Sequence, residues 1–130
     1  MGDSGVGKTD FCLSAIKKNH KVNPKPKPTI GIELYTINRT INNQFIKVGI
    51  WDYNGQVKYQ GDEEENLKYM DAFVLVFDLS NRSTFESLTE WLKLAKSDEQ
   101  NVMYMVVGTK SDLKRQVTSE EIAEFAKAIG

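Results

Sequence analysis

Apolar residues change their spacing several times along the chain, and this change predicts helices that alternate with strands. Behind a glycine-rich opening, Phe11, Ala15 and Ile16 recur at helical spacing and predict a short helix. The next segment holds three prolines between residues 23 and 29. Proline fixes φ and has no N–H group to donate, so we expect an extended loop there.

A two-stranded hairpin is predicted next. Residues 30–41 and 45–51 are both strand-like, and Asn42-Asn43 between them is a turn signal. Strands joined by so short a turn pair in antiparallel fashion. The apolar side chains expected on one face of the second strand are those of Ile46, Val48 and Ile50.

The second half of the chain alternates strand, helix, strand and helix. Residues 72–79 form a nearly continuous apolar run, which is typical of a strand buried on both faces, and residues 102–107 repeat that pattern. A capping box marks the start of each predicted helix: Ser83-x-x-Glu86 and Thr118-x-x-Glu121. The alternation predicts a single α/β domain over residues 1–130, with a mainly parallel sheet flanked by helices.

Composition excludes several classes of protein. Hydrophobic residues make up 40% and charged residues 27%, which is ordinary for a globular domain with a core. Seventeen basic and eighteen acidic residues give a net charge of -1, which argues against a nucleic-acid binder. Cys12 is the only cysteine, so neither a disulfide within the chain nor a zinc cluster is expected, and a cytoplasmic setting fits.

The opening of the chain fits the phosphate-loop pattern G-x-x-x-x-G-K-[ST] at every position: Gly2-Asp3-Ser4-Gly5-Val6-Gly7-Lys8-Thr9. Glycines let the backbone turn its N–H groups inward around phosphate oxygens. Lys8 is expected to reach the β- and γ-phosphates, and the Thr9 hydroxyl to ligate Mg²⁺. Alone, the motif leaves the base open, and a chance glycine-rich turn before a helix would look the same.

A second motif follows the predicted hairpin directly. Trp51-Asp52-Tyr53-Asn54-Gly55-Gln56 resembles the stretch W-D-T-A-G-Q of the small GTPases. The resemblance implies that Asp52 holds Mg²⁺ through water, that the Gly55 N–H group meets the γ-phosphate and that Gln56 orients the attacking water. In isolation, Asp52 would be a turn residue at a strand end and Gln56 an exposed loop residue.

A third motif ends the last predicted strand. Gly108-Thr109-Lys110-Ser111-Asp112 resembles the N-K-x-D motif by which small GTPases read guanine. Asp112 can accept hydrogen bonds from both the ring N–H and the exocyclic amine of guanine, a pair that adenine lacks. By the same resemblance Lys110 lies along the base. Thr109 replaces the usual Asn, as it does in the Rho branch. The alternative, an ordinary polar turn, fits poorly at the carboxyl end of a parallel strand.

The segment Pro28-Thr29-Ile30-Gly31 resembles the first switch of the Rab branch of the Ras superfamily. The resemblance implies that Thr29 contacts Mg²⁺ and the γ-phosphate of GTP. It also implies three kinds of partner: a guanine-nucleotide exchange factor, a GTPase-activating protein and effectors. Family members act in vesicle traffic, so we expect a monomer in the cytoplasm whose full-length form works on the cytosolic face of endomembranes.

The family pattern extends beyond both ends of this sequence. The family has a strand before the phosphate loop, where only Met1 precedes Gly2 here. Its last strand, S-A-K base loop, final helix and prenylated tail would follow Gly130. We therefore expect an incomplete G domain without a membrane anchor, in which the order 2-3-1-4-5-6 lacks strand 1. Either a gap remains there, or the flanking strands close up on each other.

Two internal segments depart from the family pattern. Lys21 stands near the position where the Ras branch has an aromatic residue over guanine, and we interpret the neighbouring His20 as a surface loop residue. In the second switch, Val57 replaces the usual Glu, and the run from Asp62 to Glu65 is acidic. We interpret that run as a solvated helix face, with a surface for basic partners as the alternative.

The favoured function is a GTP-binding switch that hydrolyses GTP slowly, with GTP, GDP and Mg²⁺ as its ligands. The groups expected to act in hydrolysis are Gln56, Lys8 and Thr29. One alternative is a degenerate G domain that binds nucleotide poorly and serves as a protein-interaction module. An adenine-specific ATPase or kinase is a further alternative, but it leaves the motifs at Asp52 and Asp112 unexplained.

Overall fold

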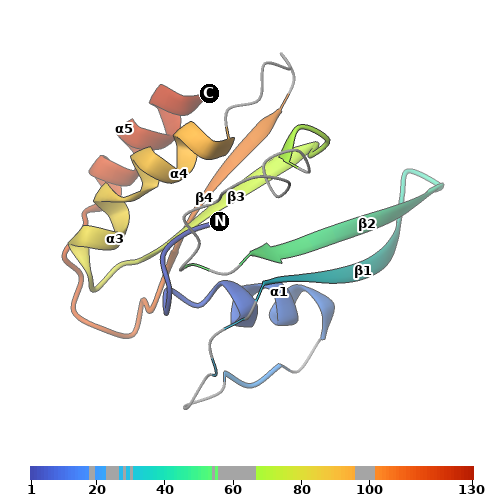
Figure 1. Cartoon of the computed structure of the whole chain (residues 1–130), viewed down its shortest axis with the longest axis horizontal. Helices are drawn as coiled ribbons and strands as arrows, with labels where there is room; N and C mark the ends of the chain where they lie inside the picture. Colours follow the sequence, from blue (N-terminus) through green and yellow to red (C-terminus); the bar gives the residue numbers. More distant parts are fainter. Residues whose placement is uncertain are drawn as a thin grey trace.

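The computed structural model describes residues 1–17, 20–22, 27, 29, 31–53, 55, 67–95 and 102–130. These residues form two small sheets with helices beside them (Figure 1). The first sheet is the antiparallel pair β1 (Ile32–Ile41) and β2 (Gln44–Tyr53). The second is the parallel pair β3 (Ala72–Asp78) and β4 (Met103–Thr109). The α/β class expected from the sequence is confirmed.

The hairpin is built around the predicted turn. Asn42 and Asn43 have φ of 50° and 62°, and two successive residues with positive φ suit the right-handed twist of the strands on either side. The pairing runs from Ile41 opposite Gln44 to Ile32 opposite Tyr53. β1 begins two residues later than predicted, and β2 extends beyond both predicted ends. The hairpin projects from the rest of the chain, and α1 (Lys8–Ile16) packs beside it (Figure 1).

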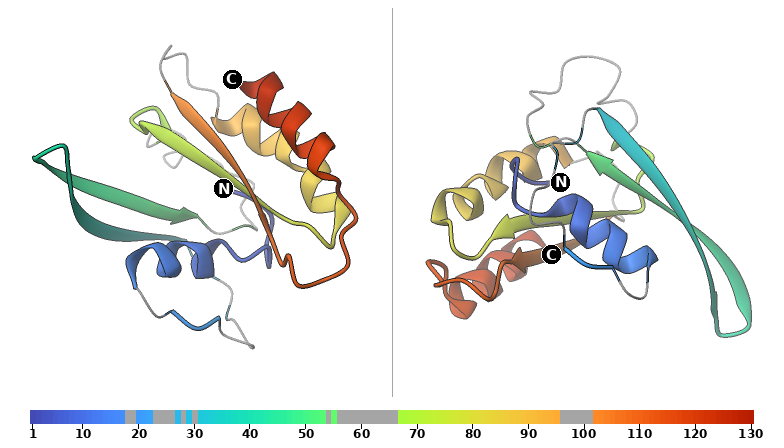
Figure 2. Two further views of the ribbon diagram at one scale, coloured as in Figure 1. Left: turned by 180° about the vertical axis from the view of Figure 1, so that it is seen from behind. Right: turned by 90° about the horizontal axis from the view of Figure 1, so that it is seen from below.

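The parallel pair holds the centre of the core, but its two strands are buried unequally. Leu75 and Phe77 of β3 are fully buried, as predicted. The prediction that residues 102–107 form an equally buried strand is wrong, because Met103 and Met105 of β4 are 68% and 57% exposed. Figure 2 shows the reason: the described helices of the second half lie together on one side of this sheet. The side chains of β4 that point away from them stay exposed.

Three helices cover the parallel pair: α3 (Arg82–Glu86), α4 (Leu88–Ala95) and α5 (Ser119–Ile129). The capping box at Thr118 and Glu121 is confirmed, with both reciprocal hydrogen bonds present. The one predicted at Ser83 is wrong. The N-cap is Asn81, whose side chain accepts from the Ser83 backbone N–H, so the helix begins earlier than the Ser83 pattern implied. No helix among the described residues is both long and apolar enough to cross a membrane.

Aromatic rings join β3 to two of these helices. The ring centroids of Phe77 and Phe85 lie 5.0 Å apart, and those of Phe85 and Phe125 lie 5.5 Å apart in an edge-on arrangement. Such tilted contacts place the positive edge of one ring against the negative face of the next. Leu88 and Val117, both almost fully buried, belong to the same cluster.

The two sheets do not merge. Among the described strands, β2 and β3 are not hydrogen-bonded neighbours, so the predicted alternative in which they close up on each other is wrong. Met1 lies along β3 instead. Its nitrogen donates to the Val74 carbonyl at 2.6 Å, and Val76 N donates to the Met1 carbonyl at 2.8 Å. This alternation is that of a parallel ladder, so the residue leading into the phosphate loop pairs as a strand would.

Replacing Phe77 by Ala should lower the free energy of unfolding by about 3–5 kcal/mol, because it opens a cavity between β3 and α3. Met103→Ala is the control. Its side chain is mostly exposed, so the loss should stay within about 0.5 kcal/mol. Urea unfolding followed by circular dichroism measures both, and equal losses would contradict this account of the core.

Candidate phosphate and metal site

The phosphate loop is shaped by its glycines. Gly5 and Gly7 have φ of 78° and 93°, values that glycine adopts at no steric cost. At Gly2, an added Cβ would lie 2.0 Å from the Val76 carbonyl oxygen, so only glycine lets the loop start this close to β3. α1 follows the loop and has no side-chain cap at its N-terminus. Its first N–H groups therefore remain as donors for an anion.

Lys8 folds back over the loop that precedes it. Its ammonium group donates to the backbone oxygens of Gly2 and Asp3, both at 2.8 Å. Burial lowers the pKa of Lys8 below its ordinary value, while the nearby carboxylates of Asp52 and Asp3 act in the opposite direction. An ammonium group carries three protons, so one remains for a phosphate oxygen.

Three predicted metal ligands from separate segments meet beside Lys8. The Thr9 hydroxyl donates to Asp52 Oδ2 at 2.5 Å, and its oxygen lies 2.9 Å from the Thr29 hydroxyl oxygen. A hydroxyl has a single proton, and that of Thr9 is directed at Asp52, so Thr29 is the donor in the second bond. The site thus brings α1, the end of β2 and the first predicted switch together.

Asp52 sits in the most unusual environment of the three. It is 2% exposed, and no described residue bonds its Oδ1 atom. Burial raises the pKa of Asp52, although the Thr9 hydrogen bond and the charge of Lys8 oppose that rise. A buried carboxylate oxygen without a partner is costly unless a cation or donor meets it.

These oxygens fit Mg²⁺. It is a hard cation that prefers oxygen ligands and usually takes only one or two protein carboxylates, with water and phosphate oxygens completing its shell. Within the described part of the chain, no three His, Cys, Asp or Glu side chains cluster to hold a metal by themselves. A cation here would therefore depend on Thr9, Thr29, Asp52 and the oxygens of a bound phosphate.

Gly55 lies against the phosphate loop, as its predicted role requires. A Cβ added there would come within 2.4 Å of the Asp3 carbonyl carbon and the Ser4 nitrogen, and 2.5 Å from Lys8 Nζ. No larger residue could approach so closely. Gln56, Val57 and the acidic run from Asp62 to Glu65 lie outside the described residues, so the predictions made for them stay predictions.

The predicted base-reading segment contacts the phosphate loop from the other side. The Thr109 hydroxyl lies 2.6 Å from the Val6 carbonyl oxygen and 3.0 Å from that of Phe77, so it ties the loop to β3. The Lys110 ammonium pairs with Asp78 at 2.7 Å. Asp112 is exposed in the turn after β4.

The pairing of Lys110 has an electrostatic consequence for Asp78. Burial by itself would raise the pKa of Asp78, but the bonds from Lys110 and Ser80 outweigh it and leave the pKa below its ordinary value. The structure thus assigns Thr109 and Lys110 a part in holding this edge of the sheet together.

Sequence reasoning missed two contacts of this region. His20, interpreted as a surface residue, has a side chain only 12% exposed, with its Nε2 atom 2.8 Å from Asp10 Oδ1 on α1. The Trp91 indole N–H donates to Asp3 Oδ1 at 2.7 Å. Neither contact has a local sequence signal, because the partners are 10 and 88 positions apart.

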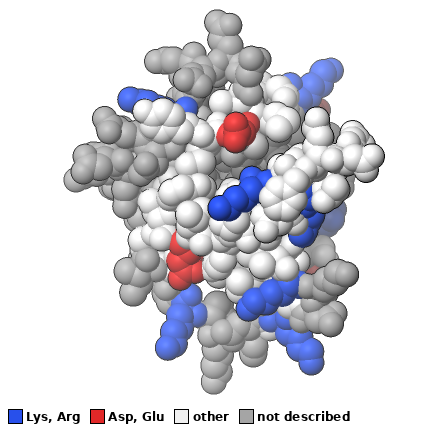
Figure 3. All heavy atoms as spheres, turned by 90° about the vertical axis from the view of Figure 1, so that its right-hand side faces the viewer, with Lys and Arg blue, Asp and Glu red and all other residues white. Residues whose placement is uncertain are grey.

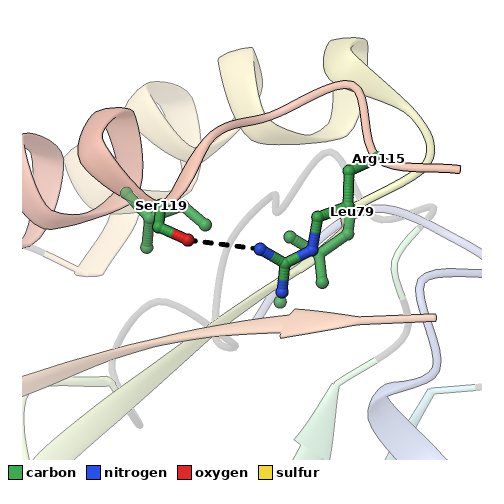
Figure 4. A pocket seen from close by; sticks show the side chains of 5 residues that line it. Leu79, Arg115 and Ser119 are labelled. Atoms are coloured by element: carbon green, nitrogen blue, oxygen red, sulfur yellow. Dashed lines mark hydrogen bonds between the residues drawn. The ribbon is translucent and has the colours of Figure 1, made fainter. Parts of the chain in front are cut away.

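A shallow hollow, separate from the candidate site, lies on the α5 side of the parallel sheet. It is lined by Leu79, Gly108, Arg115, Ser119 and Ile122, none of which is a predicted site residue. Figure 4 shows the Arg115 guanidinium over Leu79 with its bond to Ser119 Oγ, 3.2 Å long. On the hairpin side of the molecule, Lys and Arg side chains are spread over the surface, with acidic side chains between them (Figure 3).

Comparisons with known proteins agree with the motifs. The sequence model of the Ras family matches residues 1–130. The chain is 39% identical to the Ras-related protein YPT3 of Nicotiana plumbaginifolia over 133 residues, which cover 100% of this chain and 60% of the relative. It is 37% identical to the Ras-related protein RABA1c of Arabidopsis thaliana, over 98% of this chain and 59% of the relative.

A fungal relative gives the same result. The GTP-binding protein ypt3 of Schizosaccharomyces pombe is 35% identical over 97% of this chain and 59% of its own length. The chain thus spans about 60% of the length of the curated relatives it matches.

In the nucleotide-free chain, Asp52→Asn should become increasingly more stable than the wild type as the pH rises. The folded state holds the Asp52 proton more tightly than the unfolded chain does. The stability that this carboxyl contributes is therefore present below its unfolded pKa and lost as the pH rises through the folded pKa. Between about pH 4 and neutrality, the free energy of unfolding of the wild type should fall relative to Asp52→Asn.

Urea unfolding in the absence of Mg²⁺, repeated along that pH range, measures the difference. Asp112→Asn makes the same chemical change at an exposed position and is the matched control. A pH profile for Asp52→Asn that tracks this control would contradict the account of a buried carboxylate with one unbonded oxygen.

Proposed function

This chain belongs to the Ras family, and from that premise we propose that it is a GTP-binding switch that hydrolyses GTP slowly. The observation that carries the proposal is the meeting of Lys8, Thr9, Thr29 and Asp52 around one point. These residues come from three segments separated along the chain. Their ammonium, hydroxyl and carboxylate groups are those a magnesium–phosphate ligand needs.

In this proposal the chain's own groups bind and orient the phosphates. The N–H groups of residues 5–9 face the β-phosphate. The remaining N–H of the Lys8 ammonium group donates a hydrogen bond to the β- or γ-phosphate. Thr9 and Thr29 would offer hydroxyl oxygens to Mg²⁺, and Asp52 would hold it through water. When bound, Mg²⁺ supplies positive charge that offsets the charge developing on the phosphate oxygens.

Hydrolysis is expected to be slow because the proposed site has groups that position water and phosphate but, among the described residues, no arginine to stabilise the transition state. Gln56 is proposed to orient the attacking water, with Lys8 and the Gly55 N–H group stabilising charge on the γ-phosphate. The three arginines are all engaged elsewhere: Arg39 with Ala15, Arg82 with Glu86 and Glu121, and Arg115 with Ser119. A transition-state arginine would therefore come from a GTPase-activating partner.

The base and the partners belong to the same proposal. Asp112 is exposed at the end of β4, on the segment whose Thr109 touches the phosphate loop, and is proposed to select guanine. An exchange factor and effectors would complete the switch. We place the activity in vesicle traffic at the cytosolic face of endomembranes, as for Rab proteins. The competing proposal, an interaction module with little nucleotide affinity, draws on the exposed hairpin side chains of Leu34 and Trp51.

Titration of the chain with a fluorescent GDP analogue in Mg²⁺ tests this function, with unlabelled GTP and ATP as competitors. We expect GTP to displace the analogue and ATP to require at least about 100-fold more, because adenine leaves the Asp112 carboxylate without its paired donors. Equal competition would favour an adenine nucleotide as the natural ligand. Absence of any binding would favour the interaction module.

Asp112→Asn is the matched variant in the same titration. The amide keeps the shape of the carboxylate but presents one acceptor and one donor, so it can serve only one of the two guanine donors. We expect GDP affinity to fall about tenfold or more, with the ATP response unchanged. An unchanged GDP affinity would mean that Asp112 does not read the base.

A further inference from the structure

Helix α4 reaches the phosphate loop through one side chain. The indole N–H of Trp91 donates to Asp3 Oδ1 at 2.7 Å, although the two residues are 88 positions apart. A hydrogen bond to a carboxylate is stronger than one between neutral groups. Asp3 is the second residue of the loop, so this bond joins the loop to α4, the helix that packs on β3.

The donor in this bond is held rigidly. Trp91 is 7% exposed, and Leu88 and Ala95 of the same helix are 0% and 1% exposed. All three residues belong to the core cluster that includes Leu75 and Phe77 of β3. A ring buried in the core has little rotamer freedom, so the indole N–H keeps one position. The Asp3 carboxylate that accepts from it is thereby held in place.

The acceptor lies where two functional groups meet the loop. The backbone oxygen of Asp3 accepts from Lys8 Nζ, and Gly55 makes its closest approach at the Asp3–Ser4 peptide. The Asp3 side chain and backbone are joined at one Cα atom. Fixing the carboxylate therefore restricts how that peptide can rotate, and with it the orientation of Lys8 and the space beside Gly55.

We propose that Trp91 is a positioning residue for nucleotide phosphate, acting through Asp3. The indole holds the Asp3–Ser4 peptide in the orientation that the phosphates need before they arrive. The role rests on the proposed function, since it is the phosphate-binding geometry that is being held. It predicts that nucleotide release depends on a helix that contributes no group to the site.

The dissociation rate of a fluorescent GDP analogue, chased with excess GDP in Mg²⁺, tests the role. Trp91→Phe keeps an aromatic ring in the core but removes the donor, and Asp3→Ala removes the acceptor. We expect each to release GDP about tenfold faster, and the double variant to be no faster than either alone, because both changes break the same bond. Asp3→Asn keeps an acceptor oxygen and should stay closer to the wild type.

Two controls separate positioning from loss of stability. Trp51→Phe makes the same chemical change at a half-exposed residue of the hairpin and should leave the rate unchanged. Leu88→Val loosens the packing of α4 without touching Asp3, so it should lower the urea midpoint but not speed release. If Leu88→Val speeds release as much as Trp91→Phe, the role of Trp91 is only structural and the proposal is overturned.

A readout without nucleotide completes the test. In the Trp51→Phe background a single indole N–H remains, and its nuclear magnetic resonance signal should shift when Asp3 is replaced by Ala. If the wild type binds GDP but Trp91→Phe releases it at the wild-type rate, the positioning role fails while the proposed function stands. If the wild type binds no GDP, both fail, whether or not the indole signal reports the contact.

Discussion

The phosphate loop is held by bonds to both halves of the fold. Among the described residues the two sheets share no hydrogen-bonded strand pair, so these bonds help to link them. On the hairpin side, Thr9 bonds Asp52 at the end of β2. On the side of the parallel pair, Met1 lies along β3, Thr109 bonds the Val6 carbonyl and Trp91 bonds Asp3. The loop is thus both the candidate ligand site and one connection between the two halves of the fold, beside the packing of Tyr53 of β2 into the core cluster of β3.

This arrangement leaves electrostatic strain at the point where a ligand is proposed to bind. Burial opposes the charge of both Lys8 and Asp52, and one carboxylate oxygen of Asp52 has no bond from the described residues. A magnesium–phosphate ligand would meet both needs, since the cation pairs with the carboxylate and the phosphate with the ammonium. Binding and folding are therefore expected to be linked, with the ligand stabilising the fold by mass action.

The sequence predicted most of the fold and the composition of the site, for identifiable reasons. Periodic patterns located the hairpin and α5, and a continuous apolar run located β3. The resemblance of two motifs to those of small GTPases implied that Thr9 and Asp52 serve the same metal ion, and the two side chains are in contact. Prediction from the sequence failed in two ways. Locally, two neighbouring polar residues could each serve as the N-cap, and Asn81 caps the helix instead of Ser83. At long range, helices cover only one face of the sheet and leave Met105 of β4 exposed. The Trp91–Asp3 bond could not be predicted, because only the tertiary packing of α4 brings them together.

Amide hydrogen exchange with and without GDP and Mg²⁺, read on peptides by mass spectrometry, tests the central claim most directly. The claim is that segments far apart in the sequence close around one ligand. It predicts that protection rises together in peptides that carry residues 2–9, Thr29, Asp52 and Thr109–Asp112, while the hairpin turn at Asn42-Asn43 does not change. Protection confined to one of these segments, or none at all, would contradict it.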